Sequence, residues 1–300
     1  EDFTPVESVL LVLEIPRTND KQELAAEQLF ASLHGILRDN KELRLSGGHQ
    51  EHISFEIASV NGQIRFYVWV PKTLQSFVEG QIYSQYPTVQ IHQADEDYTE
   101  HERDHEVAYS TELALTTDEF LPIRTFQNFE VDPLAGITGT LAKLETTGEE
   151  LWIQVLVRPI PDDWQNAADR YINSIKNGRM FSLPGFGGSM QWLIGVLGAL
   201  WQPPEQGANQ STAVELSDRD KTRISEAEKK ATKLGYEVKI RLVYMGESQT
   251  NAKLRMQALV GTFKQFNSTN LNGFHAVKGA FGKEFIDKYR KRSFIGDGFI

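Results

Sequence analysis

The sequence predicts an α+β fold with antiparallel sheets, and three observations lead to this prediction. Ile53, Phe55 and Ile57 alternate with polar or small residues, and a second alternating run extends from Ile64 to Val70. The two runs are separated by Asn61-Gly62, a dipeptide typical of a two-residue hairpin turn, because both turn residues need a positive φ. Segments with apolar residues at helical spacing lie before and after this hairpin.

The first unit is predicted to be a split β-α-β-β-α-β arrangement within residues 1–93. The apolar run Val9–Ile15, closed by Pro16, suits a central strand, and Asp20 with Glu23 forms a capping box for the helix that follows. A second helix is expected after Thr73, with a final strand at Thr88–Ile91. This order is that of the ferredoxin-like fold, so both helices should lie on one face of a four-stranded antiparallel sheet.

A second unit of the same ferredoxin-like type is predicted over residues 107–277. Residues 94–106 are expected to be a charged linker before it, and residues 278–300 a basic segment after it. The second unit again alternates strands and helices, and it carries an apolar insertion at about residues 178–217. Its expected strands and helices are 107–116, 132–144, 151–159, 162–175, 218–234, 236–244, 251–266 and 273–277.

The composition excludes several kinds of site. The chain of 300 residues contains no cysteine, which rules out disulfides, thiolate metal sites and cysteine nucleophiles. Its formal net charge of −10 argues against a generic polyanion binder, which is normally basic. No signal-peptide pattern precedes the first strand.

No complete catalytic motif is present, and the sequence therefore predicts neither a catalytic residue nor a cofactor in this chain. The run Gly279–Lys283 lacks the first glycine of a phosphate-binding loop, where Val277 stands, and its Ser or Thr, where Glu284 stands. His101-x-x-x-His105 has the spacing of two zinc ligands on a helix, but a charge run of this kind is usually solvated, and no metal site is predicted.

The insertion contains a short apolar run bounded by tryptophan at both ends. A membrane span needs about 20 apolar residues, so this run is too short to cross a bilayer. Two interpretations remain open: contact with a membrane surface or a partner, or a short buried helix. The residues proposed for contact are Trp192, Leu193, Ile194, Val196, Leu197, Leu200 and Trp201.

A second set of candidates could contact nucleic acid. Arg65, Tyr67 and Trp69 share one face of a predicted strand, a position where RNA-recognition domains place stacking aromatic residues. The opposing interpretation for this face is that the second unit covers it. For the basic stretch at the C-terminal end, the opposing interpretation is a solvated helix. The basic candidates at the C-terminal end are Lys288, Arg290, Lys291 and Arg292.

Four segments carry a resemblance to a known family. Ala25–Ile36, Ile64–Lys72, Phe77–Pro87 and Gln154–Pro159 together resemble the N-terminal region of type IV secretion or conjugation-type ATPases of the HerA/FtsK class, as found in candidate-phyla bacteria. The resemblance covers most of the chain. The nucleotide-binding motifs of that class have no counterpart here, so no catalytic residue is carried over.

The resemblance implies a non-catalytic docking and assembly domain that is followed by a P-loop ATPase domain, where ATP and Mg²⁺ would bind. It implies membrane-associated secretion machinery as the partner, a homo-oligomer, contact with nucleic acid through the full-length protein, and a cytoplasmic location at the inner face of the membrane. The alternative, from the residues themselves, is a ferredoxin-like module that binds single-stranded nucleic acid.

Overall fold

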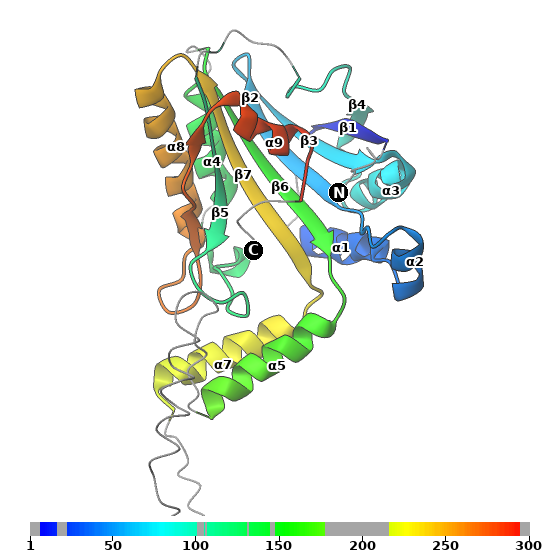
Figure 1. Cartoon of the computed structure of the whole chain (residues 1–300), viewed down its shortest axis with the longest axis vertical. Coiled ribbons are helices and arrows are strands. Elements are labelled where there is room, and N and C mark those ends of the chain that lie inside the picture. Colours follow the sequence, from blue (N-terminus) through cyan, green and yellow to red (C-terminus); the bar gives the residue numbers. More distant parts are fainter. Residues whose placement is uncertain are drawn as a thin grey trace, which may run out of the picture.

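A computed structural model describes residues 7–16, 23–100, 105, 107–130, 132–144, 148–177 and 216–294. It confirms the α+β class, with one large antiparallel sheet of nine strands and helices on its faces (Figure 1). The strand order is β4-β1-β3-β2-β6-β7-β5-β8, and β9 pairs with β5.

The first half contains the strands and helices that its sequence pattern predicts. The predicted hairpin is confirmed, because Asn61 and Gly62 have φ angles of 51° and 73°. The structure adds one short helix, α2, which begins with a capping box of Asp39 and Glu42 and which the apolar pattern did not predict. The elements are β1 (Ser8–Glu14), α1 (Glu23–Leu33), α2 (Asn40–Leu45), β2 (Ile53–Val60), β3 (Gln63–Pro71), α3 (Gln75–Gln85) and β4 (Gln90–Gln93).

The second half also follows the predicted order, with two short elements added near its end. Asp132 caps α4 and Pro133 opens it, as the Asp-Pro pair predicts. The elements are β5 (Val107–Leu115), α4 (Pro133–Ala142), β6 (Glu150–Pro159), α5 (Asp163–Lys176), α7 (Asp218–Ala231), β7 (Tyr236–Gly246), α8 (Gln249–Phe263), β8 (Phe274–Ala276), β9 (Ala280–Phe281) and α9 (Asp287–Arg290).

The two halves are joined edge to edge rather than packed face to face. Strand β2 pairs antiparallel with β6 from Ile53↔Val157 to Ser59↔Leu151, so β2 and β6 are both central strands of a continuous sheet. Strand β6 then pairs with β7 along its whole length, from Glu150↔Met245 to Pro159↔Tyr236. The expectation that the second unit covers the open face of the first is therefore wrong.

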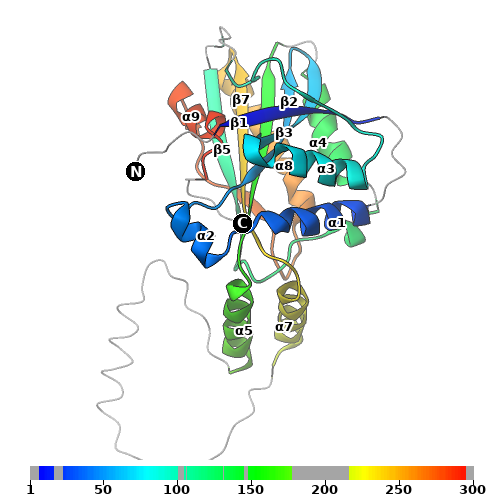
Figure 2. The ribbon, with the colours of Figure 1, turned by 90° about the vertical axis from the view of Figure 1, so that its right-hand side faces the viewer.

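One face of the sheet, called the inner face here, is covered by four helices. Helices α1 and α3 lie over the first half and α4 and α8 over the second (Figures 1 and 2). Alternate residues of the strands, such as Leu11, Ile153 and Leu242, point into this layer and are fully or almost fully buried. Burial of these side chains is the main hydrophobic contribution to the fold.

Helices α5 and α7 form a pair, called the arm here, that extends beyond the end of the sheet (Figures 1 and 2). The base of the arm is tied to the sheet by the Pro159↔Tyr236 pair and by a 3.1 Å hydrogen bond from the Ile160 amide to the Gly235 carbonyl. The arm is also braced from the side, because the Phe120 and Tyr171 rings lie 5.0 Å apart and Leu121 is buried against the helices. The ends of α5 and α7 at Asn177 and Ser217 lie at the far end of the arm.

A glycine at the base of the arm gives a first testable prediction. A Cβ atom on Gly235 would lie 2.6 Å from Cδ1 of Trp164 and 2.8 Å from Cγ1 of Ile160, closer than such atoms pack. Replacing Gly235 with alanine should lower the free energy of unfolding by about 1–3 kcal/mol, measured by urea unfolding. Gly80 in α3 is the control, because its Cβ would meet nothing within 4 Å, and Gly80→Ala should not destabilise. Equal effects of the two changes would contradict this account of the arm's base.

Candidate functional site

The other face of the sheet, called the outer face, is covered by two short segments instead of long helices. Residues 94–100, within the predicted charged linker, pack on β1, β3 and β2 through Ala94 and Tyr98. Residues 277–294, called the C-terminal strap, run from the edge at β5 across the sheet and place Ile286 and Tyr289 in the same buried layer. Figure 2 shows α9, which is part of the strap, on the side of the sheet opposite to α4 and α8.

A bidentate ion pair fastens the C-terminal strap to the sheet. Arg292 donates from Nε and Nη2 to the two carboxylate oxygens of Glu56, each at 3.0 Å, and it also contacts Asp97. The Arg292 and Glu56 side chains are 3% and 0% exposed. Burial alone would lower the pKa of Arg292, but the charges and hydrogen bonds of Glu56 and Asp97 raise that pKa well above its usual value. Arg292 is therefore charged, and its guanidinium group is engaged by Glu56 and Asp97 inside the fold.

Asp97 is held ionised by the same contact. Burial alone would raise the pKa of its carboxyl group, but the hydrogen bond and charge of Arg292, together with bonds from the Thr99 amide and hydroxyl, lower it below its usual value. Glu56, Asp97 and Arg292 come from β2, the 94–100 segment and the C-terminal strap. One three-residue cluster thus ties both covering segments to the sheet.

Two tyrosines close the outer face beside this cluster. Tyr98 stacks on Tyr67 of β3 with ring centroids 4.7 Å apart, and its hydroxyl donates to Glu56 at 2.8 Å. The hydroxyls of Tyr98 and Tyr289 are hydrogen-bonded at 2.7 Å. Burial raises the pKa of both Tyr98 and Tyr289 well above the ordinary value, so both remain protonated and serve as neutral hydrogen-bonding groups.

The polar network continues across β6, β7 and β5. Gln154 donates to Glu56 at 2.9 Å and to the Tyr289 carbonyl at 3.0 Å. Arg241 donates from Nε to Glu112 at 2.8 Å and from Nη1 to the Lys288 carbonyl at 3.2 Å. Lys239, whose side chain is 0% exposed, lies 3.8 Å from Glu112. Each carboxylate of this network faces a cation, so the network holds the covering segments on the sheet.

His52 lies at the end of the C-terminal strap and packs against Trp69. Its Nε2 donates to the Arg292 carbonyl at 2.7 Å, and its ring stacks on the Trp69 ring at 5.2 Å. Burial, followed by smaller effects from Arg158, His49 and Arg241, lowers the pKa of His52 to about 4, against a weaker opposing effect of the Arg292 hydrogen bond. His52 is therefore a neutral residue at physiological pH.

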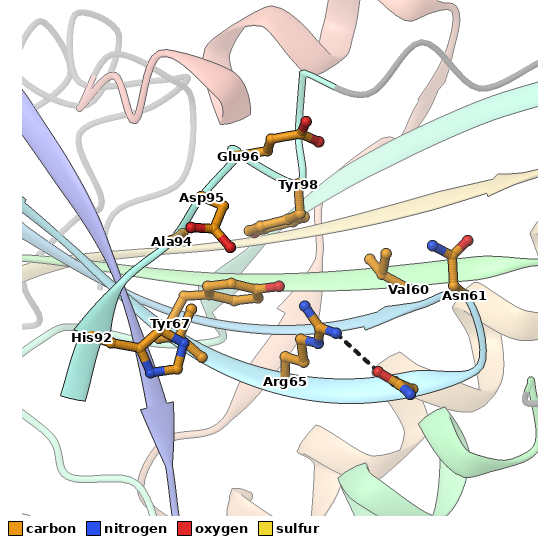
Figure 3. Close-up of a pocket in the computed structure, with 11 residues that line it drawn as sticks. Val60, Asn61, Arg65, Tyr67, His92, Ala94, Asp95, Glu96 and Tyr98 are labelled. Carbon is orange, nitrogen blue, oxygen red and sulfur yellow. Dashed lines mark hydrogen bonds between the residues drawn. The ribbon is translucent and has the colours of Figure 1, made fainter. Parts of the chain in front are cut away.

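One cavity, called the Tyr67 cavity, opens beside the stacked tyrosines. Its volume is about 590 Å³, and Figure 3 shows Arg65, His92, Asp95 and Glu96 around the Tyr67 and Tyr98 rings. Arg65 donates to Gln63 at 2.9 Å. The lining carries both positive and negative side chains and comes from β1, the β2–β3 hairpin and residues 92–98.

A larger cavity, called the Trp69 cavity, lies between the end of β3 and the C-terminal strap. Its volume is about 810 Å³. Its lining brings together Trp69 and the basic end of the chain, which are more than 200 positions apart in the sequence. It is lined by Ser8, His49, His52, Trp69, Pro71, Asp97, Glu100, Asp287, Lys288, Arg290, Lys291, Arg292 and Ser293.

The structure divides the residues predicted to contact nucleic acid. Arg65 and Tyr67 line one cavity, whereas Trp69 and the basic residues line the other. Tyr67 is only 4% exposed beneath Tyr98, so it is not part of an open stacking surface. Arg292, predicted as a surface cation, is instead buried in the ion pair with Glu56.

The remaining predicted contacts lie largely beyond what the structure describes. The membrane or partner candidates Trp192, Leu193, Ile194, Val196, Leu197, Leu200 and Trp201 fall outside the described residues, as does His101. His105 is described, and its Nε2 lies 3.2 Å from Glu150. Within the described ranges, no group of three or more His, Asp or Glu side chains could hold a metal ion, and no helix is long and apolar enough to cross a bilayer.

Sequence reasoning missed the residues that form the buried network. Glu56 and Gln154 stand at polar positions of alternating strands and looked solvent-facing, and Asp97 and Tyr98 lay in a charged linker. The available signal was the aromatic content of this face, where Tyr67, Trp69 and Trp152 share the face with polar residues such as Arg65 and Gln154. Large aromatic residues on that face indicate a cover.

Comparisons with known proteins give one family and no activity. A protein-family model described as "Domain of unknown function (DUF8128)" matches residues 7–295. No curated protein matches the chain. Among solved structures, a chitooligosaccharide oxidase is similar at 8% sequence identity and a TM-score of 0.34; the match covers 90% of this chain and 46% of the oxidase, less than half of its length. A likeness this distant carries no argument.

Proposed function

We propose a docking and assembly role for this chain, which belongs to the family described as a domain of unknown function (DUF8128). In this proposal it is the non-catalytic N-terminal domain of a type IV secretion or DNA-translocation ATPase. It works on the cytoplasmic side of the membrane, where it connects the motor to membrane-associated machinery and to further copies of itself. The ATP and Mg²⁺ chemistry belongs to a separate P-loop domain.

The observation that carries this proposal is the arm. Helices α5 and α7 are fixed at the base by sheet pairing and braced by Phe120 and Leu121. The insertion, with its run from Trp192 to Trp201, is joined to the far end of this arm at Asn177 and Ser217. An apolar, tryptophan-bounded sequence attached to a braced support, away from the sheet, suits contact with a membrane surface.

The buried network of the outer face supports the non-catalytic part of the proposal. Glu56, Asp97 and Glu112 are each neutralised by an arginine, and Tyr98 and Tyr289 are held protonated. These groups fix the two covering segments in place, which is a structural task.

The strand order supports an origin of the sheet from two ferredoxin-like units. Read within each half, the orders β4-β1-β3-β2 and β8-β5-β7-β6 are the same 4-1-3-2 order, with the arm placed between the second and third strands of the second half. In this reading the two units are joined through their second strands, β2 and β6.

Flotation with liposomes tests the membrane contact. The wild-type chain should float with vesicles that contain anionic lipid, and deletion of residues 192–201 should abolish flotation because it removes the apolar run. Deletion of residues 205–214, a mainly polar stretch of equal length in the same insertion, is the matched control and should leave flotation unchanged. Flotation that survives deletion of 192–201 would contradict the membrane role.

The coding sequence tests the ATPase connection. Translation beyond residue 300 in the source genome should give a G-x-x-x-x-G-K-[ST] motif. A stop codon directly after residue 300 would refute the proposed link to a motor domain.

A further inference from the structure

The Trp69 cavity has the size and the mixed lining of a small-molecule site. Its volume of about 810 Å³ falls in the range of roughly 300–1,000 Å³ that is usual for such sites. Its lining combines an aromatic ring and a proline, Trp69 and Pro71, with the basic residues of the C-terminal strap.

The aromatic wall is rigid and only partly covered. Trp69 is half-buried, and its ring is held in place by the stacked ring of His52, with 28° between the two planes. His52 is itself fixed by its hydrogen bond to the Arg292 carbonyl. A ring held in this way offers a stacking surface to a planar aromatic group at little cost in conformational entropy.

The C-terminal strap brings three cations to the cavity that are not neutralised by an ion pair among the described residues. Among the residues that the structure describes, the side chains of Lys288, Arg290 and Lys291 form no ion pair, whereas Arg292 is neutralised by Glu56 and Asp97. The acids left to face these three cations are Glu100 and Asp287. Counted over the lining alone, four Lys or Arg side chains stand against the carboxylates of Asp97, Glu100 and Asp287, so the lining has one more cation than anion in a chain whose net charge is −10.

Arg290 lines the cavity and also has a buried atom in its side chain. Its Nε atom is buried and has no hydrogen-bond partner in the described part of the chain. A buried N–H group without a partner is costly to the fold.

We propose that the Trp69 cavity binds a nucleotide, with the base against the Trp69 ring and the phosphate held by Lys288, Arg290 and Lys291. Two sources share this chemistry, a free mononucleotide and a nucleotide of a single strand. The site needs neither the arm nor the insertion, and it stands or falls independently of the proposed docking role.

Isothermal titration calorimetry with the full chain tests the site, using dAMP, a short deoxyadenosine oligonucleotide and inorganic phosphate as probes. Trp69→Leu should weaken nucleotide binding by about tenfold or more, because it removes the stacking surface. The double change Lys288→Glu and Lys291→Glu, at exposed positions that leave the core intact, should weaken binding at least as much and reduce its dependence on salt. Lys264→Glu, at an exposed lysine outside the cavity, should leave the affinity unchanged.

The three probes distinguish a free mononucleotide from a single strand as the ligand, and they identify the results that contradict the proposal. Equal affinity for dAMP and the oligonucleotide identifies a mononucleotide site, and binding of the oligonucleotide alone identifies a single-strand site. Binding of phosphate as tightly as dAMP would overturn the proposal, because the base would contribute nothing. Absence of binding to all three probes, or binding that neither cavity variant weakens, would overturn it as well.

Discussion

Replacing Arg292 with alanine is expected to lower the free energy of unfolding by about 3–5 kcal/mol. The change leaves the Glu56 carboxylate, which is 0% exposed, without its bidentate partner, and it frees Asp97 on the 94–100 segment. The loss of a buried charge partner costs more than the pair itself contributes, because the remaining charge is neither solvated nor neutralised. The C-terminal strap and the 94–100 segment should both become more accessible.

Urea unfolding measures the stability loss, and amide hydrogen exchange locates it. The double variant Arg292→Ala with Glu56→Gln should recover part of the loss, because no unpaired charge then remains buried. Lys221→Ala removes an exposed helical ion pair with Asp218 and should change stability little. An Arg292→Ala protein as stable as the Lys221→Ala protein would show that the buried pair does not hold the covering segments.

Acidification should destabilise the protein through His52 at a higher pH than through Asp97. The pKa of His52 is about 4 in the folded chain, below its ordinary value of 6.5, so the unfolded state binds the proton first. The contribution of neutral His52 to stability is therefore present above pH 6.5 and decreases as the pH falls. At pH 4 the free energy of unfolding should be lower by about 3 kcal/mol because of this residue. Asp97 acts in a different window, because its pKa is lowered below 3.8, and its contribution is lost only at still lower pH.

Urea unfolding at a series of pH values between 7.5 and about 4.5 tests this prediction. His52→Gln keeps a side-chain donor near the Arg292 carbonyl but cannot titrate, so its stability should depend less steeply on pH than that of the wild type. Gly80→Ala, a change at a helical glycine with no titratable side chain and open space around it, is the control and should keep the wild-type slope. Identical slopes for the wild type and His52→Gln would refute the assignment of the acid sensitivity to His52.

Much of the secondary structure could be predicted because it depends on local patterns. The alternation around Asn61-Gly62 predicted β2, β3 and the turn between them, and Asp132-Pro133 predicted the start of α4. Short elements without an apolar repeat were missed: α2 begins at a capping box of Asp39, and α9 has four residues. The site was predicted in part, since Trp69 and Lys288 were both named as contacts, although not as neighbours in one cavity.

The sequence by itself thus determined where strands, turns and most helices lie, because side-chain periodicity reports which residues share a face. It did not determine which strands pair, because the alternation of side chains along a strand is the same whichever strand lies beside it. Only the tertiary structure decided that β2 pairs with β6 and that Tyr67 lies under Tyr98. Only the tertiary structure paired Arg292 with Glu56, 236 positions away, since a charged residue looks solvated until its partner is known.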